Sequence, residues 1–220
     1  MTAPTSTKEI HVERYSRFTL ALVVVVAIVL AWSGVRPHDR WTWFLETFPV
    51  MIAFVVLGAT YRRFPLTWLA YLGVALHCVI LCVGGRYTYA MVPLGDWFRE
   101  ALDLSRNHYD RLGHIAQGFF PAILARELLL RTSPLSRGKW LSFLVVATCL
   151  AISAFYELIE WWVAAATGEA ADAFLGSQGD VWDSQWDMFL ALCGAMASLT
   201  LMGRVHDRAL GLGRKSAPAA

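Results

Sequence analysis

The sequence is poor in charge. Only 16% of its 220 residues are Asp, Glu, Lys or Arg, whereas 57% are hydrophobic. Soluble domains usually carry about a quarter charged residues. A chain of 24.6 kDa cannot hide so much apolar surface in a single core. The composition therefore excludes an ordinary soluble protein and predicts one domain embedded in a membrane.

Other signals are missing as well. No basic run with interleaved aromatic residues occurs, so we expect no nucleic-acid partner. The four cysteines lie in apolar segments and form no Cys-x-x-Cys pair, which predicts buried small hydrophobic residues rather than disulfides. No small-x-small cleavage site follows the first apolar segment, so we interpret that segment as an uncleaved membrane span.

Six apolar segments meet or approach the length of a membrane-spanning helix, which is about 20 residues. They cover residues 18–33, 47–61, 66–83, 110–130, 140–166 and 187–203. The predicted fold is all-α: one six-helix membrane domain over residues 18–203, with tails at 1–17 and 204–220. Gly84, Gly85 and Pro93 are expected to break the helix after the third segment.

A short amphipathic stretch separates the third and fourth segments. Apolar and charged side chains alternate there at helical spacing: Leu94, Trp97, Phe98, Ala101 and Leu102 lie opposite Asp96, Arg99 and Asp103. The pattern predicts a short helix that lies flat in the membrane interface. It fits equally well a helix whose apolar face packs on the protein itself.

The basic residues predict the orientation. Thirteen of the 19 lysines and arginines fall at the two ends of the chain, in the second-to-third turn and in the fourth-to-fifth connection. Because basic loops stay in the cytoplasm, both termini and the loop near Leu135 should be cytoplasmic, while Gly95 and Gly176 should lie outside. Eight of the ten tryptophans fall toward the outer side, as expected for an aromatic belt.

Ionisable residues within spans are costly and therefore informative. In the fourth segment Asp110, His114 and Gln117 share one helical face, and Gly113 and Gly118 would let another helix approach closely. Alone, Asp110 is explained as a carboxylate at a helix N-terminus, and His114 as a hydrogen-bonded interior histidine.

Two further pairs of acidic residues lie in the fifth and sixth segments. Glu157 and Glu160 end the fifth segment, and Asp183 and Asp187 open the sixth. Asp183, like Asp110, is explained by the helix N-terminus alone, whereas the two glutamates lie in an apolar run and must be paired, protonated or hydrated. In the predicted orientation all these groups fall in the outer half of the bilayer, where three helices would gather them in one cavity.

Three kinds of chemistry fit this set. The first is a divalent metal site for magnesium, manganese, iron or zinc, with ligands from Asp110, His114, Glu157, Glu160 and Asp187. The second is acid–base catalysis by Glu157, Glu160 and His114. The third is a cation or proton relay, but the sequence has neither the repeated halves nor the interrupted helix typical of secondary transporters. The acidic loop 167–185 is expected to cap the outer mouth, with Phe174, Leu175 and Trp182 packed.

Several strings resemble the YjdF-like family of bacterial inner-membrane proteins of unknown function. They are GGRYTYAMVPLG, NHYDRLGHIAQGF, FYELIEWW and GDVWDSQWDMFLALCGA. The resemblance implies a multi-span inner-membrane protein and no particular reaction. A weaker similarity to VanZ-like membrane proteins would match Asp110, His114, Glu157, Asp187 and Gly194, but Arg111 stands where those proteins have lysine.

Three functions remain open from the sequence. The first is an envelope enzyme that acts on a lipid or lipid-linked head group. The second is a non-catalytic envelope factor that binds a lipid head group or a partner protein. The third is a cation-binding permease. Membrane lipids are the expected partners in every case, and the sequence predicts no particular oligomeric state.

Overall fold

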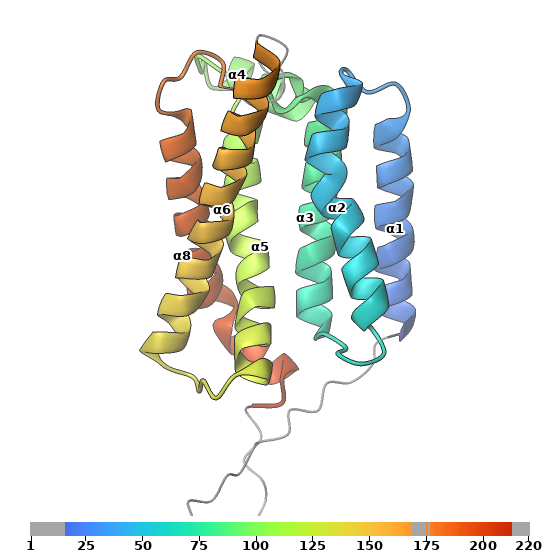
Figure 1. Cartoon of the computed structure of the whole chain (residues 1–220), viewed down its shortest axis with the longest axis vertical. Helices are drawn as coiled ribbons and strands as arrows, with labels where there is room; N and C mark the ends of the chain where they lie inside the picture. Colours follow the sequence, from blue (N-terminus) through green and yellow to red (C-terminus); the bar gives the residue numbers. More distant parts are fainter. Residues whose placement is uncertain (1–15, 169–174, 176, 213–220) are drawn as a thin grey trace, which may run out of the picture.

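The protein is a bundle of long helices in the computed structural model, which describes residues 16–168, 175 and 177–212. Six helices of 19 to 29 residues run side by side (Figure 1). They are α1 (Ser16–Gly34), α2 (Arg40–Thr60), α3 (Trp68–Tyr87), α5 (Tyr109–Thr132), α6 (Lys139–Thr167) and α8 (Asp183–Ala209). The 3-10 turn η1 (Tyr89–Met91) and the short helix α4 (Pro93–Ala101) join α3 to α5. No strand occurs in the described residues, which confirms the all-α prediction.

Five of the six long helices are apolar enough and long enough to cross a membrane: α1, α2, α3, α6 and α8. Helix α5 is the exception, because it carries charged residues near both ends. It is also the helix that packs against α3, α6 and α8 together, with ten buried residues. Its neighbours therefore shield its polar side chains, and a helix in this position needs no apolar outer face.

The bundle has two groups of helices. Helices α1 and α2 both pack on α3 but make few contacts with each other, and α5, α6 and α8 form the second group (Figure 1). The packing of α3 against α5 joins the two groups. The start of α1 and the end of α8 lie at the same end of the bundle, which we call the terminal end, and α4 lies at the opposite end.

The boundaries of α2, α3 and α8 differ most from the prediction, and α8 runs from Asp183 to Ala209 rather than over 187–203. Helix α2 begins at Arg40 rather than at 47, because Asp39 caps it: the Asp39 Oδ1 accepts a hydrogen bond from the Thr42 backbone N–H at 2.6 Å. That bond favours the charged carboxylate and lowers the pKa of Asp39. The expected break at Gly84 and Gly85 was wrong, since α3 continues to Tyr87. Gly84 faces the Tyr89 ring, where any side chain would collide.

Helices α5 and α8 approach each other closely through glycine. Gly118 of α5 lies against the Ala191 backbone of α8, and Gly194 of α8 lies against the Ile115 backbone of α5. The predicted role of Gly118 is thus confirmed, whereas Gly113 faces the ring of Tyr89 in η1 rather than another helix.

Enlarging Gly118 or Gly194 should separate these two helices. We expect Gly118→Ala and Gly194→Ala each to lower the free energy of unfolding by about 1–3 kcal/mol, because the added methyl would overlap the facing backbone. Gly203→Ala is the control, since nothing lies within 4 Å of its Cβ position, and it should gain about 0.5–1 kcal/mol of helix stability. Melting temperatures in one detergent test this, and equal values for all three variants would contradict it.

The short helix α4 forms where the amphipathic pattern predicted it. Pro93 occupies its first turn, and its apolar side chains are exposed: Leu94 by 49%, Trp97 by 61% and Phe98 by 45%. Gly95 instead lies against the Asn107 side chain, which donates a hydrogen bond to the Val92 carbonyl. The described protein therefore covers the apolar face of α4 only in part.

Candidate functional site

Three buried carboxylates from three helices surround the imidazole of His114. Its Nε2 lies 3.5 Å from the Asp110 Oδ1, 3.8 Å from the Asp187 Oδ2 and 4.0 Å from the Glu157 Oε1. Asp110 and His114 come from successive turns of α5, while Glu157 and Asp187 come from α6 and α8. We call these four residues the His114 cluster. The structure thus brings together four of the five residues that the sequence singled out.

Gln117 fixes the orientation of the imidazole. The His114 Nδ1 lies 3.0 Å from the Gln117 Oε1, so Nδ1–H donates to the amide oxygen. In that tautomer the lone pair of Nε2 points at three carboxylates. A lone pair and three negative groups repel one another unless a positive species lies between them, either a proton on Nε2 or a cation.

Two of the three carboxylates in the cluster have oxygens without a hydrogen-bond donor. Both oxygens of Glu157 and the Oδ1 of Asp187 are buried without a hydrogen-bond partner. Buried carboxylates without compensation are strongly unfavourable, whichever residues carry them. The cluster is consequently built to receive a cation, a donor or protons.

The ligand atoms have the spacing of a metal site. Asp110, His114 and Asp187 each offer one atom, and all three atoms lie within 4.8 Å of one another. A cation with bonds of about 2.0–2.2 Å separates neighbouring ligand atoms by about 3–4 Å. One imidazole with several carboxylates suits zinc, manganese or iron.

Glu160 and Glu46 lie beside the cluster. Glu160 is half-buried one turn after Glu157 and has no direct contact with His114 among the described ion pairs, although it is within electrostatic range of Glu157 and Glu46. Glu46 of α2 is buried, and its Oε2 accepts a hydrogen bond from the Tyr156 hydroxyl at 3.0 Å. Glu46 is not among the predicted site residues, because the second span was expected to begin at residue 47, whereas α2 begins at Arg40.

A set of ion pairs lies beside the His114 cluster, between the start of α5, the segment before it and the start of α8. We call these ion pairs the rim. Arg106 contacts Asp183 at 2.7 Å and Asp180 at 3.3 Å, and Arg111 contacts Asp180 at 2.8 Å. The described ion pair of Arg111 is thus with this rim carboxylate, and none is described with Glu157 or Glu160.

The rim pairs also tie the end of the loop 167–185 to the segment before α5. Gln178 strengthens the connection through two hydrogen bonds with the Asn107 backbone. Trp182, expected to pack, is 63% exposed. Leu175 is partly buried, whereas Phe174 lies with the rest of 169–174 and with residue 176 outside the described residues.

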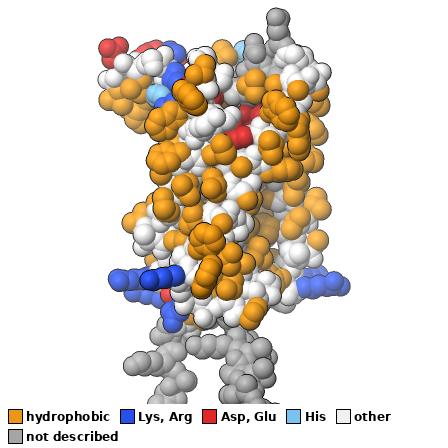
Figure 2. All heavy atoms as spheres, turned by 60° about the vertical axis from the view of Figure 1, so that its left-hand side comes forward, with side chains coloured by type: hydrophobic (Ala, Val, Ile, Leu, Met, Phe, Trp, Pro, Cys, Tyr) orange, Lys and Arg blue, Asp and Glu red, His pale blue; other side chains and the backbone are white. Residues whose placement is uncertain are grey.

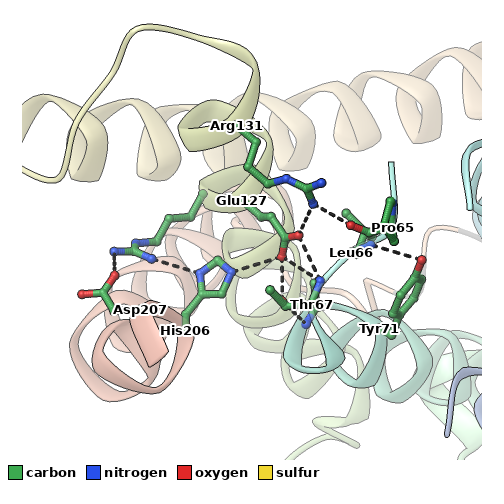
Figure 3. Close-up of polar contacts among 10 residues, drawn as sticks. Pro65, Leu66, Thr67, Tyr71, Glu127, Arg131, His206 and Asp207 are labelled. Atoms are coloured by element: carbon green, nitrogen blue, oxygen red, sulfur yellow. Dashed lines mark hydrogen bonds and ion pairs between the residues drawn. The ribbon is translucent and has the colours of Figure 1, made fainter. Parts of the chain in front are cut away.

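A second polar cluster, which the sequence analysis did not single out, lies at the terminal end. Glu127 is fully buried between α3, α5 and α8 (Figure 3). Its carboxylate accepts hydrogen bonds from the Thr67 backbone N–H and hydroxyl, contacts Arg131 at 2.7 Å and lies 3.2 Å from the His206 Nε2. We call these residues, with Arg126 and Asp207, the Glu127 network.

The Glu127 network differs from the His114 cluster in its charge balance. Glu127 has several donors, and Arg126 links His206 to Asp207, with contacts of 3.0 Å to the His206 Nδ1 and 2.6 Å to the Asp207 Oδ1. Such a network holds helices in register. None of the described carboxylate oxygens in it is buried without a hydrogen-bond partner. Glu127 and His206 are 79 residues apart in the sequence, so no local sequence pattern could predict that they meet.

Comparisons with known proteins agree with the membrane fold. A family model described as "Predicted membrane protein (DUF2238)" matches residues 18–208. A relative from Escherichia coli (strain K12), Inner membrane protein YjdF, is 51% identical over 187 residues, which cover 85% of this chain and 90% of the relative. No solved structure matches, and the comparisons do not show the similarity to VanZ-like proteins. With most of its length matched, the chain belongs to the DUF2238 family of predicted membrane proteins and is a YjdF-like inner-membrane protein.

Proposed function

We propose that the chain crosses the bacterial inner membrane six times, with α5 as the fourth span and both termini in the cytoplasm. Three observations support this orientation. Basic side chains gather at the terminal end of the bundle (Figure 2). The start of α1 and the end of α8 share that end. The exposed apolar face of α4 lies at the other end, where it would rest in the outer interface.

Cysteine labelling tests the orientation. After the four native cysteines are replaced, Glu100→Cys in α4 should react with an impermeant maleimide in intact spheroplasts, because it is exposed on the outer side. Ser136→Cys, exposed between α5 and α6, should react only after lysis. The reverse pattern would overturn the orientation, and labelling of both positions in intact cells would overturn the six-span arrangement.

We further propose that the His114 cluster binds a divalent cation and that the protein is an envelope enzyme. In this proposal the cluster is its active site, and the substrate is the head group of a lipid or of a lipid-linked molecule. One observation carries this proposal: the Nε2 lone pair of the buried His114 faces three buried carboxylates, and the facing oxygen of Glu157 has no hydrogen-bond donor. His114, Asp110 and Asp187 would bind the ion, and Glu157 would complete its coordination. A cation so placed polarises a phosphoryl or carbonyl oxygen and activates water.

The surroundings of the cluster favour a substrate that arrives from the bilayer. Acidic side chains reach the surface near the end of the bundle opposite the termini, amid apolar ones (Figure 2). Glu160 is the acidic residue of α6 that is partly exposed there, whereas Glu157 is buried. Glu160 is therefore positioned to exchange protons with a bound head group, whereas Glu157 is positioned to coordinate the ion.

The first experiment is elemental analysis of the gently purified protein, combined with mass spectrometry of the lipids that copurify. We expect close to one equivalent of a transition metal, and a melting temperature that falls when a chelator removes it. A protein without metal, whose melting temperature does not rise when manganese or zinc is added, would exclude the metal centre. The cluster would then be a neutralised structural element of a non-catalytic envelope factor.

A further inference from the structure

A long apolar groove lies on the other helix group, away from the His114 cluster. Helices α1 and α2 both contact α3 but scarcely touch each other, and the space between them forms a cavity of about 460 Å³. Its walls are almost entirely aliphatic and aromatic: they include Val23, Val26, Val50, Phe54, Leu57 and Val74. None of the ionisable residues of the two polar clusters lines it.

The groove covers about half of the membrane thickness. Along α1 its lining runs from Ser16 to Val26, and along α2 from Tyr61 back to Val50. Ten residues of helix rise about 15 Å, and the hydrocarbon core of a bilayer is about 30 Å thick. The groove therefore runs from the terminal end of the bundle to about the middle of the bilayer, which is the length of the acyl tails of one leaflet.

We propose that this groove binds one acyl chain of an anionic phospholipid from the leaflet at the terminal end. Tyr61 and Ser16 line the mouth, and the exposed Arg63 and Arg17 follow them closely in the chain. These two guanidinium groups are placed to attract a phosphate head group.

Gly58 offers a clean way to close the groove. It lines the cavity, and no atom lies within 4 Å of the position that its Cβ would take. A leucine there would extend into the space of the acyl chain, and its Cβ would collide with nothing. Gly203 of α8 is a matched control, since it is also helical, lies toward the terminal end, has no neighbour within 4 Å and does not line the groove.

The test uses the full chain in phosphatidylethanolamine vesicles that contain a small fraction of phosphatidylglycerol with a photoreactive acyl chain. Cross-linked peptides should come mainly from α1 and α2 around Val23, Val50 and Phe54. Gly58→Leu should reduce this labelling several-fold, whereas Gly203→Leu should leave it unchanged. Arg17→Gln combined with Arg63→Gln should remove the preference for the phosphatidylglycerol probe over a photoreactive phosphatidylethanolamine.

Three results would overturn the proposal. The first is labelling spread evenly over all lipid-facing helices of the wild type, which needs no variant to fold. The second is equal labelling of wild type and Gly58→Leu. The third is a chemical cross-link between two copies through α1 and α2 that Gly58→Leu abolishes, because the occupant would then be a second copy of the chain.

Discussion

Glu127→Ala should lower the free energy of unfolding by about 3–5 kcal/mol, because it removes the common acceptor of a buried charged network. The Thr67 backbone N–H and the guanidinium of Arg131 would lose a partner at once, in a place that water reaches poorly. His206, which is fully buried, would lose the carboxylate beside its Nε2. The loss should appear as a lower midpoint of detergent or denaturant unfolding.

Arg137→Ala is the matched control for this prediction. Arg137 also forms an ion pair at the terminal end, 3.1 Å from the Asp207 Oδ2, but its side chain is 53% exposed. Pairs exposed to this degree contribute about 0–1 kcal/mol. If Glu127→Ala cost no more than Arg137→Ala, the Glu127 network would not be what holds α3, α5 and α8 together.

His114→Ala should abolish binding of the divalent cation, because it removes the nitrogen ligand around which the three carboxylates are arranged. Gln117→Ala should weaken binding by about 10–100-fold, since Gln117 holds the imidazole tautomer without touching the ion. Metal content and titration with manganese or zinc, both expressed per folded protein, measure the two effects.

His206→Ala separates metal binding from folding. His206 is a buried histidine beside a carboxylate, as His114 is, but it belongs to the Glu127 network at the other end of the bundle. We expect His206→Ala to lower the melting temperature and to keep the metal. Equal metal content in wild type, His114→Ala and His206→Ala would refute the proposed centre.

The sign of the stability change in Glu157→Gln gives a further criterion. When a cation is bound, loss of this carboxylate should weaken binding and lower the melting temperature. Without a cation, the same change removes one of several mutually repelling buried carboxylates, and stability should rise. A melting temperature that rises in the presence of manganese or zinc would therefore argue against a metal and for a structural cluster.

The sequence was sufficient to predict that the six long helices exist and roughly where each lies in the chain. A helix satisfies its own backbone hydrogen bonds, and its apolar content is a local property of the sequence. It located α6 within one residue at each end, and it placed the polar residues of α5, α6 and α8 toward one end of the bundle. It also identified Gly118 as a contact point, since small residues in membrane helices let two backbones approach closely.

The tertiary structure decided which of these residues meet. Glu46 joins the neighbourhood of His114 only because α2 begins at Arg40 and turns that carboxylate toward Tyr156. Asp183 and Asp187 are one turn apart, yet the first pairs with Arg106 and the second faces His114. Thr67, Glu127 and His206 meet from three helices. Such contacts depend on the rotation and register of each helix against its neighbours, and packing between distant segments determines both.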